Sequence, residues 1–209
     1  MVRFNIFENQ EVNVNKLNFT SLTEKEHGYL VGFYVGDGNI FIQQKRGIYR
    51  LRFFLGLHEH YVQKKLFNIL SNGFKHVKEY KGEDNTYVIE VHSKDFLEHI
   101  KSIVSKDGLL QKTESKEFLK GFIEGLIDSD GHVQRNYVEI TTMNEKLKEN
   151  ILQITKDIGI KPNLRICVSG FSGKTGWRIG FSLKQSMLIH QNGYLTSKQQ
   201  VEGQSEGLT

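Results

Sequence analysis

The sequence contains no alanine, and only one proline, one cysteine and one tryptophan occur among its 209 residues. The single cysteine, Cys167, excludes a disulfide framework and a zinc site built on cysteines. No apolar run reaches the roughly 20 residues that a membrane-spanning helix needs, so we expect no membrane segment. Lys, Asn, Ile and Phe are abundant instead, which we interpret as drift in an AT-rich genome. The compartment is left open between the cytoplasm and an organelle matrix.

The charge balance is only mildly basic. Lys and Arg number 28 against 24 Asp and Glu, which gives a net charge of +4 and an isoelectric point near 9.0. Such a balance favours an anionic partner, but most of these basic residues would lie on the surface of any protein. The positions of particular residues must therefore carry the functional argument.

The chain contains an internal duplication. The segment GYLVGFYVGDG runs from Gly28 to Gly38, and GFIEGLIDSDG runs from Gly121 to Gly131. In both copies glycines stand four residues apart, a small residue precedes an acid, and an Asp-Gly pair closes the segment. The apolar spacing predicts a helix in each copy.

The small residues of each predicted helix share one face, because every fourth residue returns to the same side. They are Gly28, Gly32 and Gly36 in the first copy and Gly121, Gly125 and Ser129 in the second. Glycine in a helix costs about 1 kcal/mol relative to alanine, and close helix contact offsets that cost. We therefore expect the two helices to pack against each other, with Gly38 and Gly131 as left-handed C-terminal caps.

Each copy supplies one carboxylate, Asp37 or Asp130, at its helix end. A helix C-terminus already carries partial negative charge and unpaired carbonyls, so an acid there is unfavourable without a cation. Two carboxylates brought together, with the carbonyls of Gly36 and Ser129, form an oxygen ligand set suited to Mg²⁺. Such a site can activate water for phosphodiester hydrolysis.

These residues resemble the motifs of the single-chain, two-motif LAGLIDADG homing endonucleases. The matching positions are LVGFYVGDG, from Leu30 to Gly38, and IEGLIDSDG, from Ile123 to Gly131. The resemblance implies an α+β fold of two pseudo-symmetric αββαββα half-domains, with the motif helices at their interface and two saddle-shaped antiparallel sheets that grip DNA. It also implies Mg²⁺-dependent cleavage of both strands, with Asp37 and Asp130 as the metal acids. The first copy departs from the motif by having Val35 where the second has Asp128.

The order of elements after each motif agrees with this duplication. We expect the first half-domain, with an N-terminal arm, over residues 1–108, the second over 109–200, and a polar tail over 201–209. The predicted strands of the first half are 39–44, 49–57, 74–80 and 86–92, with helices at 59–71 and 94–105. Those of the second are 132–135, 137–143, 163–169 and 176–183, with helices at 144–158 and 184–192.

Strand alternation separates a core face from a face for DNA. We assign Leu51, Phe53 and Leu55 to the core, and likewise Leu164, Ile166 and Val168. The opposite face carries side chains able to contact base edges or phosphates. The predicted DNA-binding residues are Asn39, Phe41, Gln43, Lys45, Arg50, Arg52, His132, Gln134, Asn136, Arg165, Lys174 and Arg178. A solvated sheet face would be equally polar, so each residue also has an ordinary surface interpretation.

The resemblance further implies a lysine after the last helix of each half, near the scissile phosphates. Lys112 and Lys198 lie at these places and are the predicted catalytic lysines. A cation there would stabilise the charge that develops during hydrolysis.

The sequence thus predicts a monomeric, intron-encoded DNA endonuclease that makes a staggered double-strand break in a long target. The alternatives are an RNA maturase that binds its host intron and a DNA-binding regulator on the same scaffold. Neither alternative has a use for paired metal acids.

Overall fold

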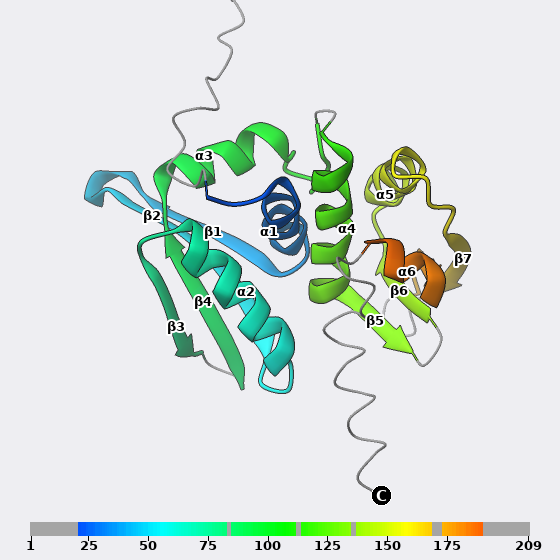
Figure 1. Cartoon of the computed structure of the whole chain (residues 1–209), viewed down its shortest axis with the longest axis horizontal. Helices are drawn as coiled ribbons and strands as arrows, with labels where there is room; N and C mark the ends of the chain where they lie inside the picture. Colours follow the sequence, from blue (N-terminus) through cyan, green and yellow to red (C-terminus); the bar gives the residue numbers. More distant parts are fainter. Residues whose placement is uncertain (1–20, 83–84, 112–113, 135–136, 169–172, 190–209) are drawn as a thin grey trace, which may run out of the picture.

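A computed structural model of the chain describes residues 21–82, 85–111, 114–134, 137–168 and 173–189. It contains two halves with the same order of elements, which confirms the predicted αββαββα repeat (Figure 1). The first half consists of α1 (Glu24–Asp37), β1 (Gly38–Gln43), the short 3-10 turn η2 (Gln44–Arg46), β2 (Ile48–Gly56), α2 (His60–Gly73), β3 (Val77–Lys81), β4 (Thr86–His92) and α3 (Lys94–Ile103). The second consists of α4 (Lys116–Asp130), β5 (Gly131–Gln134), β6 (Tyr137–Thr142), α5 (Glu145–Asp157), β7 (Asn163–Val168), β8 (Thr175–Ser182) and α6 (Leu183–Ile189).

Local sequence fixes where the two motif helices begin. Thr23 and Glu26 form a capping box, in which each side chain accepts a hydrogen bond from the backbone N–H of the other residue. Ser115 caps α4 by accepting from the N–H of Phe118. These caps satisfy N–H groups that a helix start would otherwise leave unpaired.

Each half has one antiparallel four-stranded sheet. The strand orders are β1-β2-β4-β3 and β5-β6-β8-β7, so the two sheets have the same topology. Their registers also correspond, since Gly38 pairs with Phe53 in the first sheet and Gly131 with Ile140 in the second. The duplicated sequence therefore builds two copies of one structural unit.

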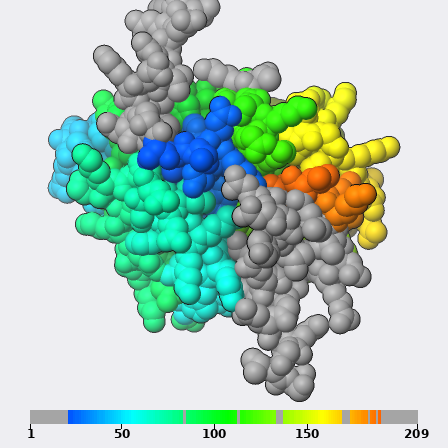
Figure 2. Space-filling view, viewed as in Figure 1, coloured from blue at the N-terminus to red at the C-terminus, as the bar shows by residue number. Residues whose placement is uncertain are grey.

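The core lies between the helices and one face of each sheet. Leu51, Phe53 and Leu55 are at most 2% exposed, as strand alternation predicts, and Phe181 of β8 is fully buried. The space-filling view shows the two halves meeting where blue α1 and green α4 adjoin (Figure 2).

The predicted left-handed caps at the ends of the motif helices are wrong. Gly38 has φ −93° and ψ 150°, and Gly131 has φ −74° and ψ 148°, which are extended conformations. Each helix passes directly into a strand that starts at this glycine, so the chain needs extended backbone here. The glycines still have a steric role, because a Cβ at Gly38 would overlap the backbone of Tyr34.

The predicted burial of β7 is also wrong. Leu164, Ile166 and Val168 are 43%, 74% and 68% exposed. They share a face with core residues such as Ile179, the register partner of Leu164. However, β7 is the edge strand, and the described helices leave its apolar side chains uncovered. Alternation identified the face correctly but not how far the core extends.

The proposed division at residues 108 and 109 stays a prediction, and the N-terminal arm and polar tail lie largely outside the described residues. None of the helices in the described segments combines the length and apolar character required to cross a membrane.

Candidate functional site

The two motif helices pack along their glycine faces, as the spacing predicts. An added Cβ at Gly28 would overlap the carbonyl oxygen of Phe118, and one at Gly32 would overlap that of Phe122. The reciprocal positions behave alike, because a Cβ at Gly125 would overlap the carbonyl oxygen of Tyr29. Backbone therefore lies directly against backbone, which only glycine permits.

This close packing brings the two helix ends together. A Cβ at Gly36 would overlap the Ser129 hydroxyl and would lie 3.3 Å from Oδ2 of Asp130. Asp37, the last residue of α1, follows Gly36 directly, and Asp130 is the last residue of α4. Asp37 is partly exposed and Asp130 is exposed, so both acids lie at a surface that a large ligand can reach.

The groups at this junction fit a divalent cation. Two carboxylates and the C-terminal carbonyls of two helices supply hard oxygen atoms and concentrate negative charge, which Mg²⁺ would neutralise. The Ser129 hydroxyl itself donates to the carbonyl oxygens of Gly125 and Leu126, so its backbone carbonyl is the better candidate ligand. Among the described residues, no group of three or more His, Cys, Asp and Glu side chains could hold a metal. The remaining ligands would have to be backbone, water or substrate oxygens.

Asp128, which has no acidic counterpart in the first motif, belongs to a buried network between the halves. It is fully buried, and its Oδ2 accepts hydrogen bonds from Tyr29 Oη at 3.0 Å and from Lys65 Nζ at 2.8 Å. Lys65 of α2 also reaches Glu124 at 2.5 Å, and Glu124 pairs with Lys25 at 3.1 Å. The network thus ties α1 and α2 of one half to α4 of the other.

The charges of this network perturb its pKa values. Burial alone would lower the pKa of Lys65, but the carboxylates of Asp128 and Glu124 outweigh burial and raise it. Burial raises the pKa of Tyr29 well above its usual value, and the neighbouring Asp128 adds to the effect. The lysine is therefore held charged and the tyrosine neutral.

The first sheet carries several predicted DNA-binding residues on the face opposite its core, which we call the outer face. Register pairs Asn39 with Arg52 and Phe41 with Arg50, so these four side chains share that face. The guanidinium carbons of Arg52 and Arg50 lie 5.3 and 5.9 Å from the centre of the Phe41 ring. The predicted residues are thus brought together.

The second sheet presents a corresponding outer face. His132 pairs with Glu139, and Arg165 pairs with Arg178 across β7 and β8. His132, Arg165 and Arg178 are exposed, as is Lys174 just before β8. Glu139, Arg165 and Arg178 also line a pocket of about 420 Å³.

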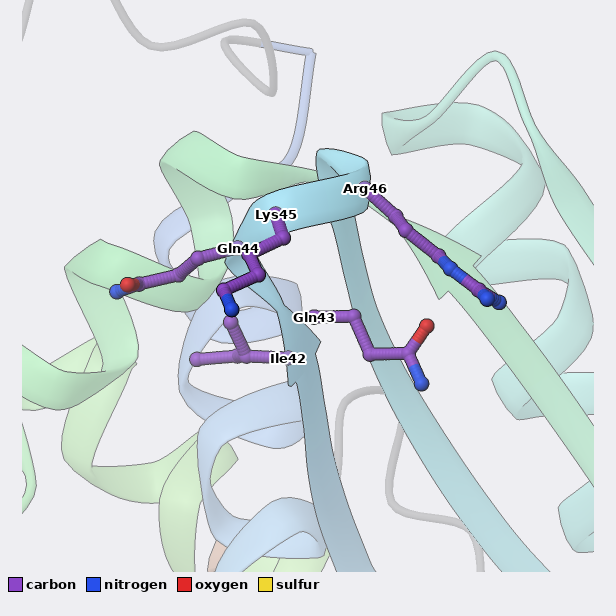
Figure 3. Close-up of a pocket in the computed structure, with 5 residues that line it drawn as sticks. All are labelled: Ile42, Gln43, Gln44, Lys45 and Arg46. Carbon is purple, nitrogen blue, oxygen red and sulfur yellow. The ribbon is translucent and has the colours of Figure 1, made fainter.

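The hairpin between β1 and β2 carries the remaining described candidates of the first half. Gln43 and Lys45 are exposed and line an open pocket with Ile42, Gln44 and Arg46. Figure 3 shows Gln43 and Arg46 projecting to one side of the hairpin, with Ile42 and Gln44 on the other. Gly47 completes the turn with φ 63°, a left-handed conformation that favours glycine.

Some predicted residues cannot be placed. Lys112, Lys198 and Asn136 lie outside the described residues, and only the backbone of Gln134 is described, in β5. Sequence reasoning also missed three charged residues that the site contains, Lys65, Glu90 and Glu139. The sequence does contain a signal for both glutamates. Each lies in a strand between two apolar residues that are buried, so strand alternation places the glutamate side chain on the outer face.

Comparison with known families identifies the second motif. Residues 117–195 match the model of the LAGLIDADG-like domain. A curated relative, an uncharacterized protein of Methanocaldococcus jannaschii, is 25% identical over 162 residues, which cover 73% of this chain and 56% of the relative. The chain therefore spans little more than half of that protein.

Solved structures with the same fold include two homing endonucleases in complex with DNA. I-DmoI in complex with DNA and Mn aligns with a TM-score of 0.59 and 18% identity, over 75% of this chain and 89% of that one. The homing endonuclease I-WcaI bound to its DNA recognition sequence aligns with a TM-score of 0.54 and 14% identity, over 87% and 86%. Full-length DUF199/WhiA from Thermatoga maritima aligns with a TM-score of 0.55 and 16% identity, over 87% and 61%.

At these identities the structural matches establish the fold alone, and the match to the family model covers the second motif and the elements that follow it. Residues 117–195 match a LAGLIDADG-like domain, and the chain has the α+β fold of the homing endonucleases I-DmoI and I-WcaI.

Proposed function

We propose that the chain is a DNA endonuclease that binds a long double-stranded target and hydrolyses one phosphodiester bond in each strand. The observation that carries this proposal is the meeting of the two motif helix ends, where a Cβ on Gly36 would lie 3.3 Å from the Asp130 carboxylate. A DNA-binding scaffold has no need for acids at such a place, because they repel phosphates. A hydrolytic metal site has a direct use for them.

The proposed cofactor is a divalent cation, with Mg²⁺ the expected ion. Asp37 and Asp130 would hold it, together with the carbonyls of Gly36 and Ser129. When bound, it would supply activation of water and stabilisation of the leaving oxygen. Related structures support a divalent ion, since I-DmoI was solved with DNA in the presence of Mn, of Ca and of Mg.

The protein's own residues would bind and orient the duplex. The two sheets lie on either side of the α1–α4 pair (Figure 1), and we propose that a duplex bound by both outer faces would pass its central phosphates over Asp37 and Asp130. Lys45 at the β1–β2 turn and Lys174 beside β8 are suited to phosphates, and the arginines of the sheets to base edges. Lys112 and Lys198 remain the proposed catalytic lysines. Because each acid belongs to one half, we propose that the two strands are cut at staggered positions.

We further propose that the chain acts as a monomer, is encoded within an intron and works in the cytoplasm or an organelle matrix. One chain already contains two motifs, so the pair of acids needs no second copy. An RNA maturase that binds the host intron, or a DNA-binding regulator, remains the alternative function.

The test is a cleavage selection, because the target is unknown. The full chain would be incubated with a library of randomised duplex DNA and Mg²⁺, and the newly formed ends would be sequenced. We expect ends that converge on one long sequence with a constant offset between strands. A double variant, Asp37→Asn with Asp130→Asn, provides the matched control and should yield none.

Two other outcomes would contradict the endonuclease proposal. Selective enrichment of uncut DNA by the wild-type chain, with no new ends in Mg²⁺ or Mn²⁺, would indicate a regulator. Binding confined to structured intron RNA, without DNA binding or cleavage, would indicate a maturase.

A further inference from the structure

Both outer faces carry a buried glutamate at a place where DNA would bind. Glu90 of β4 is 4% exposed and Glu139 of β6 is 6% exposed. Glu90 pairs in register with Arg52, and Glu139 pairs with His132, so both acids face away from the core. A negative charge here opposes phosphate binding and is costly to bury, which calls for a compensating role.

Glu90 is the centre of a cluster of basic side chains. Its Oε2 lies 2.7 Å from Nε of Arg52, and its Oε1 lies 2.7 Å from Nε2 of His92 and 3.6 Å from Nε of Arg50. Burial alone would raise the pKa of Glu90, but hydrogen bonds from His92 and Arg52 and the charge of Arg50 lower it. The carboxylate therefore stays ionised at neutral pH and can hold the arginines through charged hydrogen bonds.

The contact geometry of Arg52 matters for recognition. Glu90 binds its Nε, while the guanidinium carbon lies 5.3 Å from the centre of the Phe41 ring. An arginine side chain loses much rotamer entropy when it is fixed, so contacts that hold the guanidinium before DNA binds reduce the entropy that binding must overcome. The terminal amino groups are the part that pairs with O6 and N7 of guanine.

The second sheet has a related but looser contact, in which the glutamate lies near a terminal nitrogen of the arginine. Nη1 of Arg178 lies 3.5 Å from Oε1 of Glu139, and Arg165 stands opposite Arg178 in the pocket that contains all three residues. Two arginines side by side repel each other, and the glutamate offsets that repulsion. By register with Gly38 and Gly131, Glu139 occupies the position that Arg52 occupies in the first sheet.

We propose that Glu90 and Glu139 are positioning residues that orient Arg52 and Arg178 to read guanine edges in the two halves of the DNA target. This inference rests on the proposed function, since it names how the same protein selects its sequence. Because the acid and the arginine stand at different sheet positions in the two halves, each half-site is read by its own arrangement.

The test compares Glu90→Gln with Arg52→Ala on every single-base variant of the selected target. We expect both variants to lose discrimination at the same one or two base pairs, by roughly 5- to 100-fold each. The double variant should lose no more than Arg52→Ala alone, because the glutamate acts through the arginine. Affinity of Glu90→Gln for unrelated DNA should be unchanged or higher, since one negative charge is gone.

Glu79→Gln is the matched control. It removes the same charge from the first sheet, at a residue whose side chain accepts a hydrogen bond from Gln63. It should leave the base profile unchanged. Full discrimination by Glu90→Gln, or an even loss of affinity across all base variants, would overturn the proposal. If Glu90→Gln fails to fold, Glu139→Gln and Arg178→Ala form an independent pair for the second half-site.

A measurement without DNA separates this inference from the proposed function. The Nε–H proton of Arg52 should exchange slowly with water in NMR spectra of the free protein, and faster in Glu90→Gln. Equal exchange in both proteins would refute the Glu90–Arg52 contact. If the wild-type chain neither binds nor cuts DNA but this exchange difference is present, the proposed function fails while the contact stands.

Discussion

At the scale of single residues, His27 shows how burial controls charge in this fold. Its ring lies 4.7 Å from that of His99 and 5.1 Å from that of Phe118, centre to centre. Burial, with a smaller contribution from the charge of His99, lowers the pKa of His27 to about 3. The folded protein therefore holds this imidazole neutral under conditions in which an unfolded chain would protonate it.

This depressed pKa predicts sensitivity to acid. Between about pH 6.5 and pH 3 the unfolded state binds a proton that the folded state does not, so stability falls as the pH is lowered. From pH 6.5 to pH 5 the loss should be about 2 kcal/mol. We expect His27→Phe to reduce that loss in urea titrations at pH 7 and pH 5.

His60→Gln is the control, because His60 is exposed at the start of α2. It should preserve the acid sensitivity of the wild-type chain. If His27→Phe kept the same pH slope as the wild type, another group would be responsible.

At the scale of elements, the contact between α1 and α4 has no room for a methyl group. We therefore predict that Gly32→Ala and Gly125→Ala destabilise the protein by about 3 kcal/mol or more, since the added carbon must displace backbone. Thermal or denaturant unfolding measures this directly.

Gly180→Ala provides the comparison within a strand. A Cβ there would meet its nearest neighbour at 3.6 Å, an ordinary contact. Its effect on stability should be small. Equal effects of Gly180→Ala and Gly32→Ala would show that the helix interface is looser than described.

Much of this element-level structure could be predicted from the sequence. The glycine spacing predicted the helix pair, and the alternation in β2 predicted the buried Leu51 and Phe53, because both patterns are local consequences of backbone geometry. The extended Gly38 and the exposed Ile166 could not be predicted. They depend on which element follows the helix and on how far the helices extend over the sheet.

The residues of the candidate site could likewise be predicted only in part from the sequence. The motif acids follow from the duplication, whereas Glu90 and Lys65 gain their importance from partners distant in sequence. Glu90 contacts Arg52 across a strand pairing, and Lys65 reaches Asp128 in the other half. Only the folded structure brings such pairs together.

At the scale of the whole molecule, the two halves are joined asymmetrically. The second motif contributes the buried acids Glu124 and Asp128 to the interface, and the corresponding residues of the first motif are Val31 and Val35. The network of Lys25, Lys65 and these acids therefore exists on one side of the helix pair. Lys65 provides the link from α2 to α4.

We predict that Lys65→Met destabilises the protein by about 3 to 5 kcal/mol, because it leaves two buried carboxylates without their shared ammonium. Lys64→Met is the control, since Lys64 is an exposed neighbour on the same helix. Denaturant unfolding at pH 7 would compare them. Similar stabilities for the two variants would mean that the network contributes little to joining the halves.

The raised pKa of Lys65 adds a pH dependence to this link. A group whose pKa is raised on folding contributes fully to stability below its pKa in the unfolded chain, which is about 10.5 for Lys65. This contribution is lost as the pH rises through the pKa of the folded state. On the alkaline side of neutrality, the stability difference between the wild type and Lys65→Met should therefore shrink above about pH 10.5.

In the function we propose, Asp37 and Asp130 form one shared hydrolytic site at the junction of the two halves. The most direct test measures DNA binding and the cutting of each strand by Asp37→Asn and by Asp130→Asn, on the selected target in Mg²⁺. We expect each variant to bind DNA with nearly wild-type affinity and to make no double-strand break. Double-strand cleavage by either variant at the wild-type rate would contradict it.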